Sequence, residues 1–257
     1  MLRPRIIPCL LVRNGGLVKT MQFNEGKYVG DPINAVRIFN EKVVDELIVL
    51  DIDATAKNRE PNYEMIGNLA TECRMPLCYG GGVQTAEQVE KIIGLGVEKV
   101  AMSSAAVFDP NLVAQSAQRV GNQSVVVVMD VKKSGLFRRH EVFTHNGTKG
   151  TGIGPGDFAA RVQDLGAGEV VLNSIERDGK MNAYDLDLVA QVRDRLSIPM
   201  TVLGGAGSLD DISELIERFG NIGAAAGSLF VFKGKYRAVL INYPSQEEKL
   251  SLFRCGT

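Results

Sequence analysis

Eight short runs of apolar residues recur along the 257-residue chain, separated by longer segments with a helical period. Their apolarity is continuous rather than alternating, which is typical of parallel strands buried on both faces of a sheet. We therefore expect strands over residues 6–12, 47–52, 76–79, 100–102, 125–131, 170–172, 200–203 and 224–226.

The segments between these runs carry the start signals of helices. Asp31 followed by Pro32 is typical of an N-cap with proline at the first helical position. Thr85 and Ser208 each begin a segment of the capping-box type. The segment after Ser208 has apolar residues at positions i, i+3, i+4 and i+7, namely Ile212, Leu215, Ile216 and Phe219. Eight strands alternating with helices in this length favour an α/β fold, a closed (β/α)8 TIM barrel, over an open doubly wound sheet.

The chain also repeats itself at about half its length. Glu46 and Glu169 occupy matching places in two similar segments, and Gly81 and Gly204 do so in two others, each pair being separated by 123 positions. This period is too long for a solenoid, so it indicates two fused half-barrels. We expect one barrel over residues 1–244, with halves of roughly 1–121 and 122–244. Residues 245–257 form a polar C-terminal tail that we expect to be frayed.

Composition narrows the class of protein. Lys and Arg total 29 against 30 Asp and Glu, so the basic surface that nucleic acid requires is absent. No run of apolar residues is long enough to span a membrane, and no secretion signal is recognisable. We expect a cytoplasmic protein without nucleic acid or membrane partners. The 4 cysteines form no CxxC pair and there are only 2 histidines, so neither a metal nor another cofactor is indicated.

Glycine, at 28 residues, is more frequent than usual and gathers after the expected strands. Exposed backbone N–H groups in such loops bind anions. The repeated pairs therefore predict two phosphate sites, one per half, for a ligand with a phosphate at each end; the alternative is that the glycines only permit tight turns. The residues concerned are Gly81 and Gly82 with Ser103 and Ser104, and Gly204 and Gly205 with Gly227 and Ser228. Gly179, after Asp178, would likewise let the backbone approach a phosphate.

Asp130 ends the expected fifth strand and is the first candidate for acid–base chemistry. A carboxyl that follows four valines and a methionine should face the barrel mouth, where partial burial raises its pKa. The alternative is a carboxylate satisfied by nearby backbone or by Lys132. The repeat places a matching acid at position 11 of the first strand, but that position is Leu11, which cannot transfer a proton.

Four motifs make the chain resemble a known family: Arg-Ile-Ile-Pro-Cys-Leu at 5–10, the glycine triplet at 80–82, and residues 173–179 and 204–207. Together they resemble the cyclase subunit of imidazole glycerol phosphate synthase over essentially the whole chain. The resemblance implies a barrel that binds a ligand with two phosphates and receives ammonia from a glutaminase subunit. It also implies that Asp130 is one of two acid–base aspartates, that Lys19 contacts substrate, and that Asn173 and Asp178 belong to the ligand site.

Since the second aspartate is missing, the resemblance also points to a divergent branch. Residues 18–32, 33–42 and 227–232 are similar to the acetamidino-modification paralogues of this cyclase. That similarity implies a lyase-type synthase that supports amidino-sugar formation in surface-polysaccharide (lipopolysaccharide O-antigen) synthesis, with a sugar amidotransferase as a further partner. The first alternative is the ordinary cyclase of histidine biosynthesis. The second is a non-catalytic conduit that only activates the glutaminase.

Two cations and two anions stand at the N-terminal ends of four expected strands. They are Arg5, Glu46, Lys99 and Glu169. By themselves they predict an ion-pair ring that stabilises the bottom of the barrel. The family resemblance implies instead that they gate the entry of ammonia from a glutaminase docked at this N-terminal face as a heterodimer.

Overall fold

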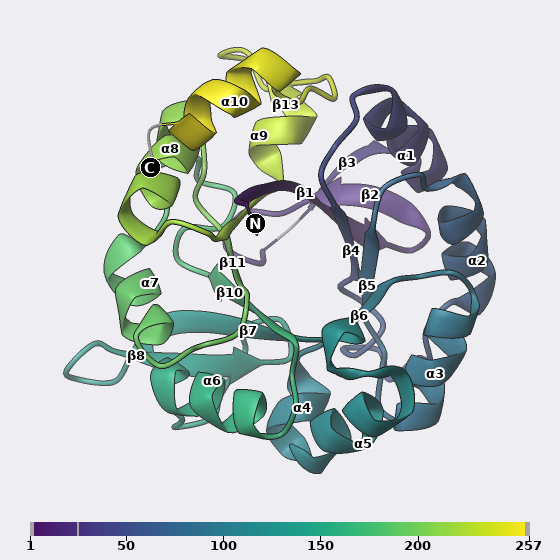
Figure 1. Ribbon diagram of the computed structural model, residues 1–257, viewed down its shortest axis with the longest axis vertical. Helices are drawn as coiled ribbons and strands as arrows, with labels where there is room; N and C mark the ends of the chain where they lie inside the picture. Colours follow the sequence, from purple (N-terminus) through teal and green to yellow (C-terminus); the bar gives the residue numbers. More distant parts are fainter. Residues whose placement is uncertain (1–2, 25, 255–257) are drawn as a thin grey trace.

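Eight parallel strands close into a barrel in a computed structural model that describes residues 3–24 and 26–254 (Figure 1). Neighbouring strands pair in chain order, and the last strand pairs with the first. The strands are β1 (Arg5–Arg13), β4 (Leu47–Asp51), β5 (Leu77–Gly80), β6 (Lys99–Met102), β7 (Val125–Ser134), β10 (Glu169–Ser174), β11 (Met200–Leu203) and β12 (Gly223–Ala226). Each corresponds to one of the apolar runs, and the prediction of a closed (β/α)8 barrel is confirmed.

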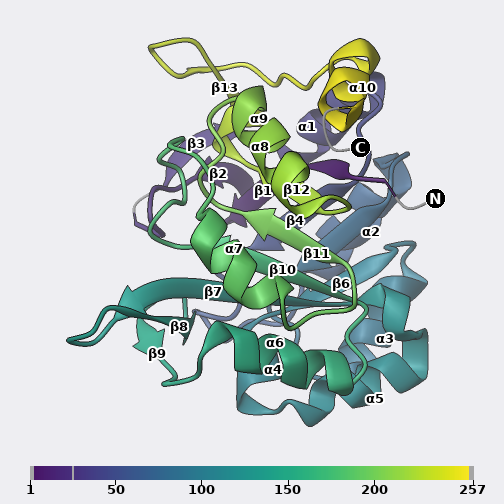
Figure 2. The same cartoon turned by 60° about the vertical axis from the view of Figure 1, so that its left-hand side comes forward.

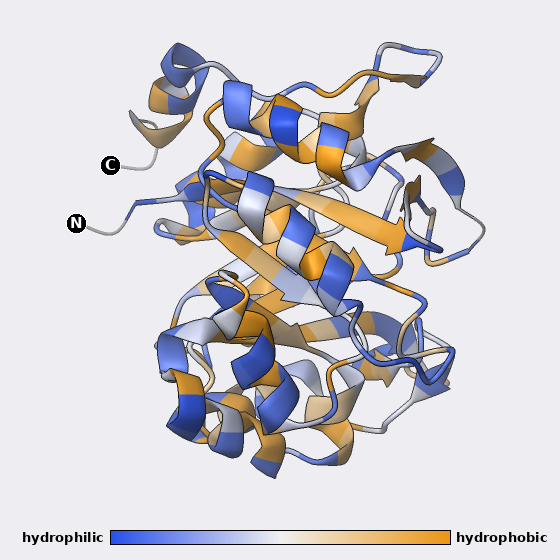
Figure 3. Cartoon of the chain, turned by 90° about the vertical axis from the view of Figure 1, so that its right-hand side faces the viewer, coloured by the Kyte–Doolittle hydropathy of each residue, from blue (hydrophilic) through white to orange (hydrophobic). Residues whose placement is uncertain are grey.

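Helices surround the barrel (Figure 2), and polar and apolar residues alternate along them (Figure 3). The long ones are α1 (Pro32–Glu41), α2 (Tyr63–Glu72), α3 (Ala86–Gly94), α5 (Asn111–Val120), α6 (Pro155–Asp164), α7 (Leu186–Arg193) and α8 (Leu209–Phe219). Asp31 caps α1, and Thr85 and Ser208 form complete capping boxes on α3 and α8, as predicted. Two short helices follow the fourth and eighth barrel strands, α4 (Ser104–Phe108) and α9 (Ser228–Val231). A single 3-10 turn, η1 (Asn122–Ser124), precedes β7.

Apolar side chains fill two separate spaces. The larger core lies between the strands and the helices, and it includes Ile212, Leu215 and Ile216 of α8. A second cluster fills the barrel interior, with Ile7, Cys9, Ile48, Cys78, Ala101, Val126, Val128, Val171, Leu203 and Ala225. Successive residues of a strand point alternately into the outer core and into the barrel interior. Both sets are buried, so the strands contain continuous apolar runs.

Antiparallel extensions lengthen two strands and were not predicted. β1 continues into β2 (Gly16–Lys19) and β3 (Lys27–Gly30), and β7 continues into β8 (Arg139–Thr144) and β9 (Lys149–Gly150). They follow the first strand of each half, so the two-fold repeat extends to the loops. A third hairpin, β13 (Phe232–Lys233) with β14 (Ala238–Val239), follows α9.

The C-terminal tail is ordered as α10 (Gln246–Arg254), so the expectation of fraying is wrong for this segment. Lys249 is 3% exposed, and its Nζ donates a hydrogen bond of 2.9 Å to Asp45 Oδ1. Leu252 is buried against the core. A few inward contacts therefore hold a helix whose composition is polar; residues 255–257 lie outside the described part. In the described residues, no helix has the length and apolarity needed to cross a membrane.

Candidate functional site

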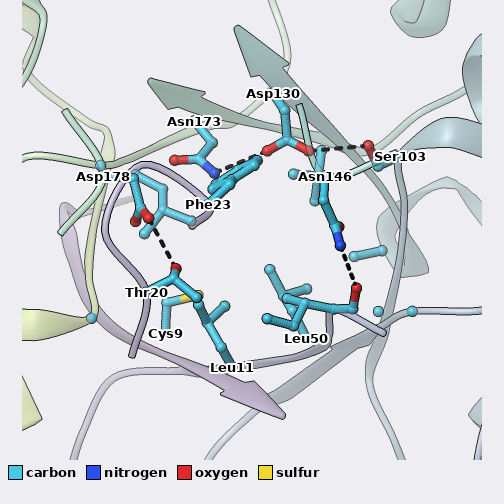
Figure 4. Close-up of a pocket in the computed structure, with 18 of the residues that line it drawn as sticks. Cys9, Leu11, Thr20, Phe23, Leu50, Ser103, Asp130, Asn146, Asn173 and Asp178 are labelled. Carbon is cyan, nitrogen blue, oxygen red and sulfur yellow. Dashed lines mark hydrogen bonds between the residues drawn. The ribbon is translucent and has the colours of Figure 1, made fainter. Parts of the chain in front are cut away.

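A cavity opens at the C-terminal ends of the barrel strands and is lined by the loops that follow them (Figure 4). All thirteen residues predicted for acid–base chemistry or ligand binding lie in its lining. They are Lys19, Gly81, Gly82, Ser103, Ser104, Asp130, Asn173, Asp178, Gly179, Gly204, Gly205, Gly227 and Ser228. The closed barrel brings these residues together around one cavity. Their roles in binding or converting a ligand stay predictions.

Asp130 lies on the cavity wall with a partner from the neighbouring strand. Asn173 Nδ2 donates a hydrogen bond of 2.9 Å to Asp130 Oδ1, and Ser103 Oγ lies 3.5 Å from Oδ2. Burial, with the nearby Asp178 carboxyl, raises the pKa of Asp130 to about 6, although these two hydrogen bonds oppose the shift. A carboxyl with this pKa can both accept and return a proton near neutral pH.

Two leucines face Asp130 and Asn173 from the opposite side of the cavity. Leu11 is paired with Leu50 across β1 and β4, as Asp130 is paired with Asn173 across β7 and β10. Figure 4 shows Leu11 and Leu50 on one side of the opening, with Cys9 beside them, and Asp130 and Asn173 on the other. Both members of the polar pair are thus replaced in the first half, and that wall offers a ligand no proton donor or acceptor side chain at these positions.

The loop after β1 is tied across the mouth to the loop after β10. Thr20 Oγ1 donates to Asp178 Oδ2 over 3.2 Å, and the Gln22 backbone N–H donates to the Asp178 carbonyl. A Cβ on Gly179 would lie 2.3 Å from the Thr20 carbonyl oxygen, so this glycine permits the close contact of the two loops. Burial raises the pKa of Asp178, opposed by the Lys19 charge and the Thr20 hydrogen bond.

Lys19 is buried between β1 and the loop after β12. Its Nζ donates a 2.6 Å hydrogen bond to the Cys9 carbonyl and lies where a Cβ of Gly227 would be. Burial lowers the pKa of Lys19, while the charge of Asp178 opposes that change. The amine therefore sits at the cavity wall with a reduced preference for its charged form, which a ligand phosphate would restore.

The glycines of the predicted phosphate loops are required by the backbone itself. Gly81 has a φ of +122°, and a Cβ there would lie 2.4 Å from the Asp51 carbonyl oxygen. Gly205 has a φ of +118°, and a Cβ there would lie 2.1 Å from the Ala183 carbonyl oxygen. The tight-turn alternative thus accounts for these two residues, and phosphate binding by the same loops stays a prediction.

Three further lining residues come from the extensions that sequence reasoning missed. Thr20 and Phe23 belong to the first, and Asn146 to the second, where its Nδ2 donates 2.9 Å to the Ile52 carbonyl. The only available signal was the polar, glycine-containing composition of both loops. Among the described residues, no group of three His, Cys, Asp or Glu is arranged to hold a metal ion.

At the other end of the barrel, the four predicted ring residues meet in one network. Lys99 Nζ lies 2.8 Å from both Glu46 Oε1 and Glu169 Oε2. Arg5 pairs with Glu46 and, at 2.8 Å, with Glu169. Burial alone would raise the pKa of Glu169, but the two cations lower it to about 2. The four charges thus close a ring across the barrel axis; its role in ammonia passage stays a prediction.

Comparison with known proteins places these observations in a family. The family model described as "Histidine biosynthesis protein" matches residues 5–237. The chain is 56% identical over 253 residues to "Putative imidazole glycerol phosphate synthase subunit HisF" of Leptospira interrogans, covering 98% of this chain and 100% of that protein. It is 57% identical over 249 residues to "Putative imidazole glycerol phosphate synthase subunit hisF3" of Vibrio vulnificus, covering 97% and 96%. A hisF2 protein with the same description from Pseudomonas aeruginosa is 53% identical over 244 residues, covering 95% and 97%.

Proposed function

Because the chain belongs to the histidine biosynthesis protein family, we propose that it is the barrel subunit of an ammonia-dependent synthase of the imidazole glycerol phosphate synthase type. Its reaction uses one carboxyl group, that of Asp130, rather than a pair. The observation that carries this proposal is the cavity itself, in which Asp130 and Asn173 face Leu11 and Leu50. The ligand has an anionic group at each end, held by the loops around Gly81 and Gly204.

One carboxyl suffices for exchanging a carbonyl oxygen for nitrogen. When ammonia attacks the carbon, its nitrogen gains a positive charge and must lose a proton, which the Asp130 carboxylate accepts. The same carboxylic acid passes that proton to the oxygen, which gives a neutral carbinolamine. A second transfer of a proton from nitrogen to oxygen through Asp130 lets the oxygen leave as water and forms the C=N bond, so ammonia replaces one oxygen with no net change at Asp130. The pKa of about 6 suits both steps.

Ring closure with elimination makes a different demand. It needs a proton donor and an acceptor on opposite sides of the substrate. Leu11 and Leu50 occupy the wall opposite Asp130 and can do neither. The arrangement therefore favours transfer of ammonia to an acceptor over formation of an imidazole ring.

Ammonia comes from a glutaminase subunit at the N-terminal face and passes the ring of Arg5, Glu46, Lys99 and Glu169. This order of events is supported by the position of the ring at the end of the barrel opposite the cavity. The finer part of the proposal is that the nitrogen serves amidino-sugar formation in surface-polysaccharide synthesis, together with a sugar amidotransferase at the cavity mouth. It rests on the resemblance of residues 18–32, 33–42 and 227–232 to that branch.

Purified protein with the cyclase family's phosphoribosyl-formimino substrate and excess ammonium salt tests the proposal. We expect no cyclisation above the rate without protein. Cyclisation well above that rate would establish the ordinary cyclase of histidine biosynthesis instead. The conduit alternative is tested with the glutaminase and amidotransferase partners present: if Asp130→Asn leaves glutamine-dependent amination unchanged, the barrel only passes ammonia.

A further inference from the structure

A second hollow adjoins the cavity on the side of the second half-barrel. Lys19, Thr20 and Ser228 line both spaces, so the two lie next to each other. The rest of the second hollow comes mainly from β3 and the β13–β14 hairpin, which Figures 1 and 2 show next to each other. We call its outer residues the cationic shelf: Lys27, Phe232, Lys235, Tyr236 and Arg237.

The charge on the shelf is all of one sign. Lys27, Lys235 and Arg237 are cationic, and no acidic residue lines the hollow in the described part of the chain. Lys27 Nζ lies 5.6 Å from the centre of the Phe232 ring, and the residue is exposed, so its ammonium group is accessible to an anion. These three cations, with no acidic residue in the described lining of the hollow, create a positive potential that attracts multiply charged anions such as a diphosphate.

The shelf also presents an aromatic surface. Tyr236 is 90% exposed at the tip of the hairpin, between Lys235 and Arg237 in the chain. An exposed ring flanked by cations is suited to stacking on a planar base while the charges hold phosphate groups.

The shelf has no counterpart in the first half of the barrel. There, α4 is followed almost directly by α5, whereas in the second half α9 is followed by the β13–β14 hairpin. The two predicted phosphate loops, around Gly81 and Gly204, follow the two-fold repeat. The cationic shelf occurs only in the second half. Such a departure is expected where one end of an unsymmetrical ligand extends beyond the cavity.

We propose that the cationic shelf binds the diphosphate and base of a nucleoside-diphosphate group, whose attached part enters the cavity. The diphosphate is the anionic group at the Gly204 end of the cavity, and it passes Ser228, which lines both spaces, to contact Lys235, Arg237 and Lys27. Tyr236 stacks on the base. This inference rests on the proposed function, because the attached part would reach Asp130 and receive nitrogen there. It names the class of acceptor as a nucleotide-linked molecule.

Calorimetric titration of the full chain with uridine diphosphate, inorganic pyrophosphate and uridine tests the shelf. We expect saturable binding of uridine diphosphate, weakened about tenfold or more by Lys235→Ala/Arg237→Ala, since each cation contributes to anion binding. Tyr236→Ala should weaken uridine diphosphate severalfold and leave pyrophosphate binding unchanged. The matched control is Lys133→Ala/Arg139→Ala, which removes two exposed cations from the other hairpin, β7–β8.

Absence of saturable uridine diphosphate binding overturns the inference, as does equal weakening by the control variant. Tight pyrophosphate binding that is indifferent to Tyr236→Ala, with uridine diphosphate binding no tighter, reduces the shelf to an anion site and also overturns it. A separate variant tests the proposed function. Asp130→Asn should leave uridine diphosphate binding intact while abolishing amination, so loss of either result identifies which of the two statements fails.

Discussion

Asn173 holds Asp130 by a hydrogen bond of 2.9 Å across adjacent strands, and the equivalent pair in the other half of the barrel is Leu50 beside Leu11. The first half therefore lacks both the acid and the amide that would donate a hydrogen bond to it. An amide left without its acid, or an acid without its amide, would be a polar group at a partly buried position with no partner. In the first half both positions of the pair hold leucine.

Restoring the acid alone should be unfavourable. Leu11→Asp places a carboxyl against Leu50 without a donor, and we expect it to lower the free energy of unfolding by about 1–3 kcal/mol. Leu11→Asp/Leu50→Asn recreates the pair found at Asp130 and Asn173, and we expect about 1 kcal/mol of favourable coupling between the two changes. Urea unfolding of the two single variants and the double variant measures this coupling.

The double variant also has a functional readout. If the missing acid is what prevents ring closure, ammonium-dependent cyclisation of the phosphoribosyl-formimino substrate should increase in Leu11→Asp/Leu50→Asn and not in Leu50→Asn alone. Strictly additive stabilities and no gain of cyclisation would contradict the idea that these positions act as a pair.

Asp130 should make the protein less stable as the pH rises. Its pKa is raised to about 6 in the folded state from an ordinary value of 3.8, so the folded state binds the proton more tightly than the unfolded state. The stabilisation is complete below about pH 4 and is lost as the pH rises through about 6, by about 2–3 kcal/mol. Asp130→Asn should lack this decline and lose about 100-fold or more in amination rate.

Thermal unfolding from pH 4 to pH 8 checks this dependence. Ser103→Ala is the companion variant, because removing the hydroxyl that favours the Asp130 carboxylate should move the decline to higher pH. Parallel curves for the parent chain and Asp130→Asn would show that another group carries the pH dependence.

The eight barrel strands were predictable because both their faces are buried, which makes most of their positions apolar. The extensions were not, since β8 and β9 contain charged residues such as Arg139 and Lys149 and are defined by pairing with β7 or with each other. Helix α10 was missed for a related reason: its composition is polar, and it is held by the inward contacts of Lys249 and Leu252.

The candidate site, too, was predictable only in part. Asp130 was found because an acid ends an apolar strand, and the glycine loops because they repeat. The partners that tune them could not be found from spacing. Thr20 contacts Asp178 only because the two loops cross the same mouth, and the Leu50–Leu11 pairing depends on the register between β1 and β4.

Lys249 should stabilise the barrel from the C-terminal helix. Its Nζ pairs with the buried Asp45 carboxylate, whose other oxygen accepts the Ile6 backbone N–H at 3.0 Å. Lys249→Met keeps the length of the side chain and removes the charge, so we expect a loss of about 2–3 kcal/mol. Thermal unfolding should show it as a lower melting temperature, and hydrogen exchange should accelerate at the start of β1. The exposed Glu247→Gln on the same helix should change neither.

The ion-pair ring should stabilise the protein near neutral pH and set the coupling between glutamine and amination. Glu169 has its pKa lowered to about 2, so the folded state binds this proton less tightly than the unfolded state. The resulting stability is present above the ordinary glutamate pKa of about 4.5 and is lost as the pH falls through about 2. Lys99→Met leaves Glu46 and Glu169 with Arg5 alone, which should destabilise the protein by about 2–3 kcal/mol and move acid unfolding to higher pH.

The same variant separates a gate from a purely stabilising ring. If the ring controls ammonia passage, Lys99→Met should change the rate of glutamine-dependent amination while the rate with added ammonium, which reaches the cavity from its open mouth, stays the same. Arg37→Met is the control, because its pair with Glu72 is exposed and contributes little to stability. An equal change in both rates would mean that the ring acts only by stabilising the barrel, since a gate at the N-terminal face cannot affect ammonia that enters from the other end.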